Sequence, residues 1–472
     1  MPGQSTCPDG FASEYTGYVF AAPPDKFASE WVCVDRSPQL WGVQFPGDDG
    51  SNNRAVSEMS PAEWSGVAGR TDGTEVVCAV CGSNADATGA VFTHWGQAAC
   101  PSGFTTLFGG AVYGHNTLAR GGGMNMLCAP GSVPEEERVP VSAANEGGAP
   151  LTYAALMGEA LNDHFAQIAS ENRRLPACAL CQAAPEQTSS LTVPGRKSCP
   201  ADHVLAYAGL LMAAHTNEQR REFICMDAAA QGLSVSMNTG TAARLVFAEI
   251  AVDVSARLGI NTAAGTLTPY VVGHELSCAQ CVASGGGTFA RWGRMVCPVT
   301  SSAVYAGFAA SSPFNLGGGA STMCLPWEPE YGDFKAGTGF TTQVASTEWE
   351  GLTQFVPANY EVPCTMCQVN ALSTSVMVPG TTQCPAGFVR DYAGMLSTER
   401  NHHNRREYIC IDGRPDSTGL PNNDNGATFY RVELDSPNAE GYTFAREISC
   451  SMCHPSNSSE FTSGAGSLLG LC

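Results

Sequence analysis

The stretch CPAGFVRDYAG (residues 384–394) is one of five openings that share one pattern along the chain. Each opening begins with Cys-Pro, has an aromatic residue eight positions after the cysteine, and has a glycine two positions after the aromatic residue. The opening cysteines are Cys7, Cys100, Cys199, Cys297 and Cys384, and the aromatic residues are Tyr15, Phe108, Tyr207, Tyr305 and Tyr392. A fixed period of this length indicates an array of similar units, so the fold prediction starts from the repeat.

Each copy continues with a middle cysteine and ends in a C-x-x-C pair. The middle cysteines are Cys33, Cys128, Cys225, Cys324 and Cys410. The closing pairs are Cys78 and Cys81, Cys178 and Cys181, Cys278 and Cys281, Cys364 and Cys367, and Cys450 and Cys453. Twenty of the 21 cysteines therefore fall into five sets of four, and Cys472 is left over. A leftover cysteine in a secreted chain predicts a free thiol or a bond to another molecule.

The spacing predicts five units followed by a tail. The units cover residues 1–90, 91–188, 189–286, 287–372 and 373–456, and the tail covers residues 457–472. Repeats 1, 3 and 5 (type B) have Pro-Gly before the opening cysteine, whereas repeats 2 and 4 (type A) have Trp-Gly, at Trp95 and Trp292. This alternation predicts that A and B units pack as pairs. Both tryptophans are expected to be buried where a B unit meets the A unit after it.

Short strand-like segments, such as residues 204–211 and 428–433, are separated by clusters of Gly, Pro, Asn and Asp. This pattern predicts a mainly β protein, a tandem array of five small disulfide-bonded domains that resemble β-sandwiches or barrels. In residues 151–174 the apolar positions approximate helical spacing, so a helix inserted in repeat 2 is also predicted. Units of this size have marginal cores, and two disulfides in each would add ~2–4 kcal/mol apiece.

Composition restricts the partners and the compartment. The 472 residues carry a formal net charge of −20, which disfavours nucleic acid and anionic membranes as partners. No run of 18 apolar residues exists, so no membrane span is predicted. Evenly placed cysteines predict an oxidising, extracellular compartment. No signal peptide is visible, so the chain is expected to be a processed or partial form of a secreted protein.

The repeats resemble the cysteine-rich globular modules of short-chain, spongin-like collagens of sponges and other invertebrates. In type B units the resemblance lies in Pro-Gly before Cys-Pro and in REYICID (residues 406–412). In type A units it lies in RWGR (residues 291–294) and VPCTMC (residues 362–367). The resemblance implies an extracellular structural module without enzymatic activity. Unlike that family, this chain has no Gly-X-Y segment, so no collagen triple helix is expected.

The C-x-x-C pairs have two alternative interpretations, a zinc site or a redox centre. A zinc ribbon uses two closely spaced pairs per site, whereas each set here has one pair and two lone cysteines. A thioredoxin-like motif would need an α/β pattern around it. We therefore expect two disulfides within each repeat, no metal, no cofactor and no catalytic residues. Side chains alternate along a strand, so each pair is expected to bond to the opening and middle cysteines, in a connectivity left open.

Two other features have competing interpretations. The repeated aromatic residue is expected to be core, with a sugar-stacking platform as the alternative. Arg220-Arg221 and Arg405-Arg406 precede the middle cysteine at the same offset. They are expected to be solvated turn charges, or else to pair with an acidic face of a neighbouring unit. Asn457 begins the single N-glycosylation sequon.

The two ends of the chain suggest a function. The later B repeats have an apolar segment before Pro-Gly, and repeat 1 begins at Met1, Pro2 and Gly3 without it. The tail supplies apolar residues that would suit such a strand, namely Phe461, Leu468, Leu469 and Leu471. We expect a secreted structural protein that polymerises head to tail into an extracellular fibre, the tail of one copy completing repeat 1 of the next as a β-strand. The alternative is a multivalent, lectin-like protein that binds extracellular glycans.

Overall fold

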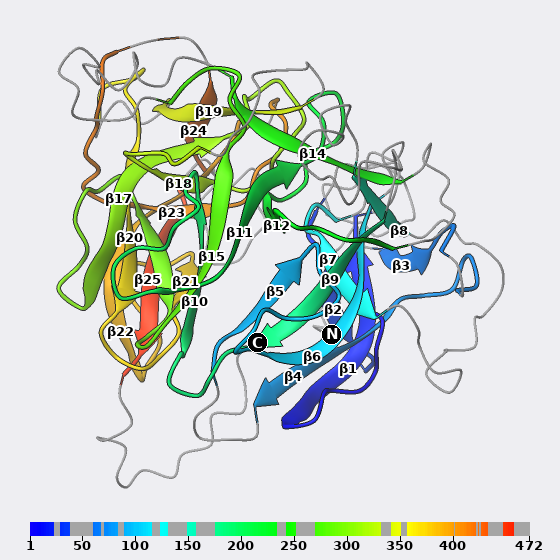
Figure 1. The fold of residues 1–472 in the computed structure, drawn as a ribbon. Coiled ribbons are helices and arrows are strands. Elements are labelled where there is room, and N and C mark those ends of the chain that lie inside the picture. Colours follow the sequence, from blue (N-terminus) through cyan, green and yellow to red (C-terminus); the bar gives the residue numbers. More distant parts are fainter. Residues whose placement is uncertain are drawn as a thin grey trace, which may run out of the picture.

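The computed structural model describes residues 1–22, 29–37, 60–67, 70–83, 89–115, 123–130, 149–156, 175–233, 242–251, 270–331, 341–350, 356–400, 402–421, 423, 426–432 and 447–456. The regular structure in these ranges consists of strands β1 to β25 (Figure 1), with no helix among them. The expectation of a mainly β, disulfide-rich chain is confirmed.

Every repeat builds the same strands from the same parts of its sequence. An aromatic strand holds the aromatic residue and its glycine: β1 (Phe11–Ala21), β6 (Thr105–His115), β11 (Val204–Ala213), β17 (Ser301–Ser311) and β22 (Phe388–Thr398). A middle strand holds the middle cysteine: β2 (Val32–Asp35), β7 (Leu127–Pro130), β12 (Ile224–Asp227), β18 (Met323–Pro326) and β23 (Ile409–Asp412). A closing strand holds C-x-x-C: β4 (Val77–Ser83), β9 (Leu175–Gln182), β15 (Ser277–Ala283), β20 (Pro363–Val369) and β25 (Ser449–Pro455).

Two further kinds of strand join these. An opener strand precedes the opening cysteine in repeats 2 to 5: β5 (Val91–Trp95), β10 (Ser189–Pro194), β16 (Thr288–Trp292) and β21 (Val376–Pro379). A spine strand lies between the middle and closing strands: β3 (Ser60–Trp64), β8 (Ala149–Leu156), β14 (Ala243–Ile250), β19 (Thr342–Trp349) and β24 (Ala427–Arg431). The short β13 (Gly232–Leu233) pairs with β9.

Within a repeat the pairing is antiparallel. In repeat 3, for example, β11 pairs with β12, β14 and β15, and β15 pairs on its other edge with β10. In all five repeats the register between the aromatic and closing strands shifts just before the aromatic residue, as between Leu205 and Tyr207. The position two residues after the aromatic residue requires glycine, because the backbone of the middle strand lies very close to it. A Cβ at Gly209 would overlap the carbonyl oxygen of Met226 on the middle strand.

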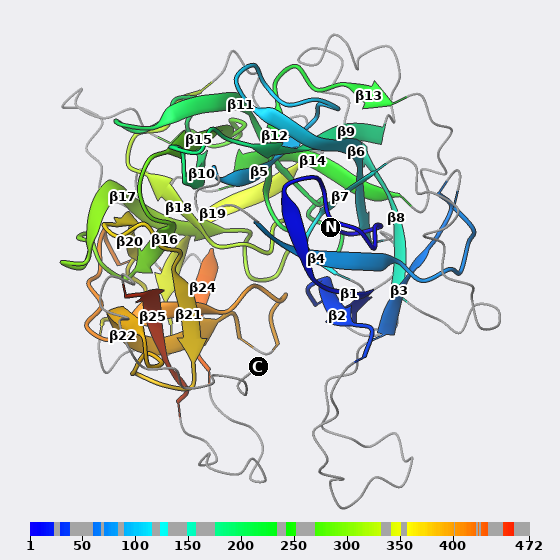
Figure 2. The same cartoon turned by 90° about the horizontal axis from the view of Figure 1, so that it is seen from below.

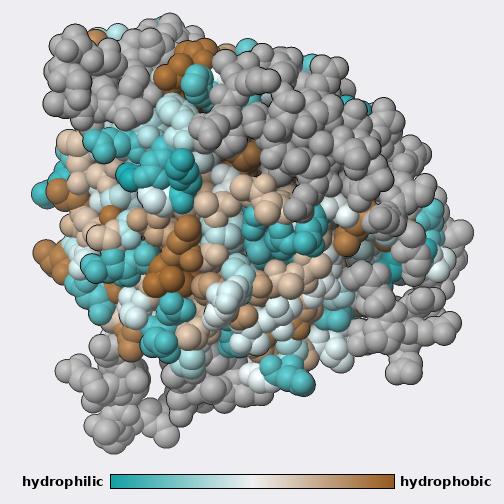
Figure 3. Space-filling view, viewed as in Figure 1, coloured by the Kyte–Doolittle hydropathy of each residue, from teal (hydrophilic) through white to brown (hydrophobic). Residues whose placement is uncertain are grey.

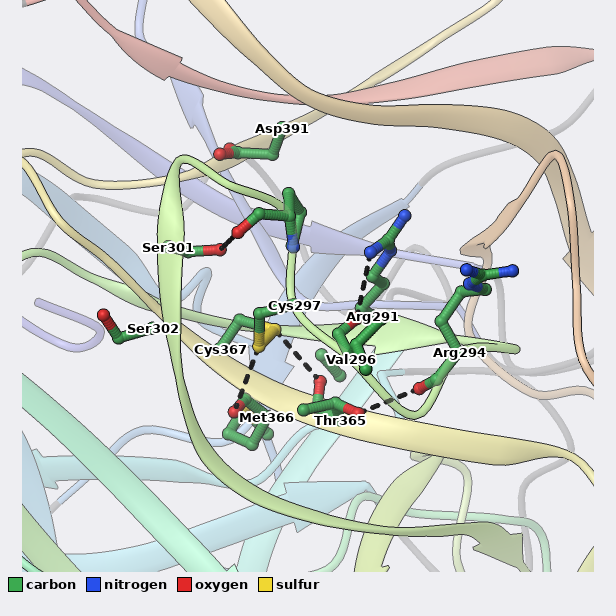
Figure 4. Close-up of a disulfide and its surroundings, with 12 residues drawn as sticks. Arg291, Arg294, Val296, Cys297, Ser301, Ser302, Thr365, Met366, Cys367 and Asp391 are labelled. Carbon is green, nitrogen blue, oxygen red and sulfur yellow. Dashed lines mark hydrogen bonds between the residues drawn. A yellow bond between two sulfur atoms is a disulfide. The ribbon is translucent and has the colours of Figure 1, made fainter.

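The twenty cysteines of the five sets form ten disulfides, each within one repeat. In every set the opening cysteine bonds to the second cysteine of C-x-x-C, and the middle cysteine bonds to the first: Cys7–Cys81, Cys33–Cys78, Cys100–Cys181, Cys128–Cys178, Cys199–Cys281, Cys225–Cys278, Cys297–Cys367, Cys324–Cys364, Cys384–Cys453 and Cys410–Cys450. Figure 4 shows Cys297–Cys367, next to which Thr365 Oγ1 donates to the carbonyl oxygen of Arg294 at 2.9 Å. The two cysteines of a pair point to opposite faces of their strand, which explains why they bond to two different cysteines and not to each other.

The repeats are joined by hydrogen bonds between their strands. The spine strands pair in parallel in the order β3, β8, β14, β19, β24 and run across the upper part of Figure 1. The pairing is staggered: the first half of β14 pairs with β8, from Ala243, and its second half pairs with β19, up to Ile250. All five repeats therefore contribute to one hydrogen-bonded network of strands.

A second ladder runs through the residues just before each middle strand. In repeat order, its contacts join Ser29 with Gly123, Met124 with Glu222, Arg221 with Gly319, and Ala320 with Glu407. The first and third of these are parallel bridges, and the other two are backbone hydrogen bonds of 2.8 and 3.2 Å. We call this set of contacts the central ladder.

The helix predicted over residues 151–174 is wrong in its first part. Residues 149–156 form β8, which pairs with β3, β6 and β14, and residues 157–174 lie outside the described residues. The apolar spacing predicts a helix here because β8 is covered on both faces and therefore has apolar residues on both. Leu151, Ala154 and Leu156 are all buried, so no alternation of polar residues marks it as a strand.

Candidate assembly interface

Met1, Pro2 and Gly3 lie along the outer edge of β4. The amino group of Met1 donates to the carbonyl oxygen of Ala79 at 2.8 Å, and the Ala79 N–H donates back to Met1 at 3.1 Å. The Gly3 N–H donates to the carbonyl oxygen of Val77 at 2.7 Å. The three predicted interface residues at the head of the chain therefore pair with the first part of β4.

Beyond Ala79 this edge of β4 pairs with no other strand in the part of the chain that the structure describes. In repeat 3 the equivalent edge is covered, because β10 pairs with β15 along six residues. Leu191 and Val193 of β10 are buried by that pairing. Among the residues that the structure describes, repeat 1 thus presents an open strand edge where repeat 3 has a closed one.

A cavity of about 360 Å³ lies beside the open edge. Repeat 1 lines it with residues of β1, β2 and β4, such as Val19, Val32 and Ala79. Repeat 2 lines it with apolar side chains that include Leu107 and Leu180. The walls are predominantly apolar, so the cavity suits hydrophobic side chains.

The residues of repeat 2 that line the cavity are equivalent to residues of repeat 4 that contact β10. Leu107 and Val304 each follow their opening cysteine by seven residues, and Leu180 and Met366 each follow the first cysteine of C-x-x-C by two. In repeat 4, Val304 and Met366 pack in one hydrophobic cluster with residues of β10. The cavity on repeat 1 therefore lies where a strand like β10 would place its apolar side chains.

Phe461, Leu468, Leu469, Leu471 and Cys472 all lie outside the described residues, as does Asn457. In the view of Figure 3, hydrophilic and hydrophobic residues are mixed over the described surface. The cavity is equivalent to the site that β10 occupies in repeat 3. The repeat pattern in the sequence indicates such a site, because repeat 1 lacks the apolar segment that precedes Pro-Gly in repeat 3.

Three of the four paired arginines differ from the expected solvated turn charges. Arg220, Arg221 and Arg406 are buried, while Arg405 is exposed. Arg220 and Arg221 reach backbone carbonyls of other repeats rather than an acidic face, whereas Arg406 bonds to Thr428 O and Glu399 within repeat 5. Arg221 Nη2 donates to the carbonyl oxygen of His115, in repeat 2, at 2.9 Å. Every residue has a backbone carbonyl, so the residue types in the sequence do not indicate which carbonyls accept from these arginines.

Arg220 links three repeats. It extends from repeat 3 to the loop after β17 in repeat 4, where Nε donates to Leu316 O at 3.1 Å, and Nη2 donates to Ser312 O at 3.1 Å and to Pro313 O at 2.6 Å. Nη1 lies 3.4 Å from the carbonyl oxygen of Arg405 in repeat 5. This one side chain therefore links repeat 3 to repeats 4 and 5 beside the central ladder.

Two spine strands each place a glutamate opposite a glutamate of the segment that leads into the closing strand. Glu249 of β14 lies opposite Glu275, and Glu348 of β19 lies opposite Glu361, in isolated antiparallel bridges. All four side chains are buried. Burial, and secondarily the neighbouring Glu249 carboxylate, raise the pKa of Glu275 to about 7. Burial also raises the pKa of Glu249, although Thr341 Oγ1 donates to it at 3.1 Å.

The repeated aromatic residue lies against the middle strand. Tyr207 and Tyr392 are buried, and their hydroxyls donate to the carbonyl oxygens of Cys225 and Cys410 at 3.0 and 2.8 Å. Burial is the main cause that raises the pKa of Tyr207 above its ordinary value. Two of the five aromatic residues are therefore core residues, and their hydroxyls are engaged inside the protein.

The tryptophans before the opening cysteines lie at a different junction from the predicted one. Trp95 forms a parallel bridge with Met226 in repeat 3, and Trp292 forms one with Ile411 in repeat 5. The tryptophan of each A unit therefore pairs with the middle strand of the B unit that follows it. Trp292 is buried and Trp95 is half-buried.

Within the described ranges, no group of three or more His, Cys, Asp or Glu residues is placed to hold a metal ion. No helix among the same residues is long and apolar enough to cross a membrane. No protein-family model and no curated protein matches this chain. The candidate interface must therefore be judged from its own geometry.

Proposed function

We propose that this protein is a secreted structural protein, built of five tandem modules, that assembles head to tail into an extracellular fibre. The tail of one copy adds a strand to the open edge of β4 in the next, where Met1, Pro2 and Gly3 cover only the first part. Its apolar residues Phe461, Leu468, Leu469 and Leu471 enter the cavity between repeats 1 and 2. The role is structural rather than enzymatic.

One observation carries the proposal: the cavity has the same walls as the site that β10 occupies in repeat 3. Leu107 and Leu180 stand where Val304 and Met366 contact β10. An open strand edge gives backbone hydrogen bonds to an added strand, and adjoining pockets give specificity for alternate side chains. A contact between the head of one copy and the tail of another is heterologous, and it propagates into a filament unless its rotation closes a ring.

The test combines a deletion with a charge placed in the cavity wall. Removing residues 459–472 should leave a folded protein that no longer forms fibres by electron microscopy. Replacing Leu107→Asp should abolish fibres as well, because the strand would then have to bury a carboxylate. Val299→Asp is the matched control, since Val299 is fully exposed. Fibres of normal length from the deletion or from Leu107→Asp would refute strand exchange, provided that thermal unfolding shows each variant to be folded.

A further inference from the structure

The junctions between repeats 2 and 3 and between repeats 4 and 5 are built in the same way. The opener strand of the A unit lies parallel to the middle strand of the next B unit, with Trp95 paired to Met226 and Trp292 paired to Ile411. Both pairs join the residue five before an opening cysteine to the residue one after a middle cysteine. The register of this junction is therefore fixed.

Two polar contacts accompany each junction. At the first, His94 Nε2 and Asp227 Oδ2 are 2.6 Å apart, and Tyr207 OH donates to Thr93 O at 3.1 Å. At the second, Arg291 Nη2 donates to Asp412 Oδ2 at 2.6 Å, and Tyr392 OH lies 3.3 Å from Ala290 O. A B unit therefore offers a tyrosine, an apolar residue and an aspartate to the strand that it receives.

Repeat 1 carries the same three residues at the same positions, as Tyr15, Val34 and Asp35. Asp35 is exposed, and Tyr15 and Val34 are half-buried, whereas Tyr392, Ile411 and Asp412 in repeat 5 are buried. In the described part of the chain, no opener strand pairs with β2.

The local conformation of this receiving face is already formed. Asp35 Oδ1 accepts the N–H of Ser37 at 2.7 Å. Asp227 Oδ1 accepts the N–H of Ala229 at 2.6 Å, two residues further on in the same way. Tyr15 OH donates to Cys33 O at 2.9 Å, as the equivalent tyrosines do to their middle cysteines. The face of repeat 1 thus needs no rearrangement to receive a strand.

Repeat 5 carries the complementary strand. The other opener strands contact the middle strand of the following repeat, as β10 does with β18. β21 is the last of them among the described residues, and both Val376 and Pro379 are exposed. β21 and β2 lie apart in both views of the molecule (Figures 1 and 2), so they do not pair within one copy.

We propose that β21 of one copy docks in parallel on β2 of the next, with Pro379 opposite Val34 and Val378 beside Asp35. This contact rests on the proposed head-to-tail fibre and adds a second interface to the tail strand. The register follows from the two junctions inside the chain, since Pro379 stands five residues before Cys384 and Val378 six. A Pro-Gly opener is compatible with such a contact, because Gly195 of repeat 3 approaches Leu325 of β18.

The proposed contact lacks one feature of the internal junctions. His94 and Arg291 hold the position of Val378, so Asp35 receives no basic partner from β21. A charge-assisted hydrogen bond stabilises more than a neutral contact, so the junction between copies is weaker than those within the chain. This difference lets charge substitutions strengthen or weaken assembly without altering the internal junctions.

The experiment measures the critical concentration for fibre formation by sedimentation. Val378→Arg should lower it about 3- to 10-fold by recreating the pair seen between Arg291 and Asp412. Val378→Glu should raise it by a similar factor, because two carboxylates would then be adjacent. Combining Val378→Glu with Asp35→Arg should return it close to the original value. Val204→Arg and Val204→Glu, at an exposed site in repeat 3, are the matched controls and should leave it unchanged.

The outcomes separate this contact from strand exchange. If all three charge variants assemble like the original protein while the deletion of residues 459–472 does not assemble, the β21 contact is wrong and strand exchange stands. If the charge series behaves as expected but the deletion still assembles, the β21 contact stands alone. If Val378→Glu weakens assembly and Asp35→Arg does not restore it, the proposed register is refuted.

Discussion

At the scale of the residue, the repeated tyrosine acts through its hydroxyl as well as its ring. Tyr15, Tyr207, Tyr305 and Tyr392 all donate to the carbonyl oxygen of the middle cysteine in their repeat, at 2.8–3.1 Å. Repeat 2 has Phe108 in this position and builds the same strands. The ring is therefore sufficient to form the unit, and the hydroxyl adds stability.

We expect Tyr207→Phe to lower the free energy of unfolding by about 1–3 kcal/mol, because it leaves the buried carbonyl of Cys225 without this donor. The same hydroxyl hydrogen also lies within reach of Thr93 O at the junction with repeat 2, at 3.1 Å, so its loss affects that junction as well. Denaturant unfolding measures the change. Tyr15→Phe is the comparison, since Tyr15 is half-buried and should cost less. Equal losses at the two positions would contradict this account.

At the scale of the element, glutamates of the spine strands lie opposite glutamates of the segments that lead into the closing strands. Four repeats have Glu three residues before the first cysteine of C-x-x-C, at Glu75, Glu275, Glu361 and Glu447. Repeat 2 has Leu175 there, and its spine strand has Ala155 where β14 has Glu249. Ala155 and Leu175 are both buried. The same strand pairing therefore accommodates either two carboxyl groups or two apolar side chains.

The difference between repeat 2, with two apolar side chains, and repeat 3, with two carboxyl groups, leads to a prediction about the pH dependence of stability. The pKa of Glu275 is raised to about 7 from an ordinary 4.5, so the folded state holds its proton more tightly than the unfolded state. The favourable contribution is fully present below pH 4.5 and is lost as the pH rises through about 7. The loss is on the order of 1–3 kcal/mol.

Replacing Glu249→Ala together with Glu275→Leu copies repeat 2 and should flatten the fall in Tm between pH 5 and pH 8. Glu249→Gln with Glu275→Gln removes the charge but keeps the size, so it should flatten the profile too. Differential scanning calorimetry across this pH range provides the measurement. A Tm profile that stays parallel to that of the original protein would show that the pair does not titrate there.

Much of each unit could be predicted from its sequence, and little of the contact between units could. Cysteine spacing indicates two disulfides per set, because C-x-x-C on a strand directs its cysteines to opposite faces. The parallel spine could not be predicted, since its contacts join distant segments through backbone groups. The apolar spacing after Leu151 predicts a helix, whereas Leu151 and Leu156 belong to a strand that is buried on both faces. The cavity on repeat 1 corresponds to the predicted head interface, whereas the tail lies outside the described residues.

At the scale of the whole molecule, the repeats depend on one another. The spine and the central ladder cross every boundary between repeats, and Arg220 spans from repeat 3 to repeats 4 and 5. Buried guanidinium groups are costly unless their donors are satisfied, and here the acceptors come from other repeats. Each unit therefore completes its core with groups from its neighbours.

This dependence predicts that the chain unfolds cooperatively across repeats 3 to 5. Arg220→Ala removes the donors to the carbonyl oxygens of Leu316, Ser312 and Pro313, each of which is worth about 1–3 kcal/mol when left buried and unpaired. We expect the variant to lose at least about 3 kcal/mol and to unfold in two transitions, because the pairing of β14 with β19 and the central ladder then couple repeat 3 to repeats 4 and 5 more weakly. Arg405→Ala, at an exposed position, is the matched control and should keep a single transition. If Arg220→Ala lowers Tm but retains one sharp calorimetric transition, the spine alone couples the repeats and Arg220 contributes only local stability.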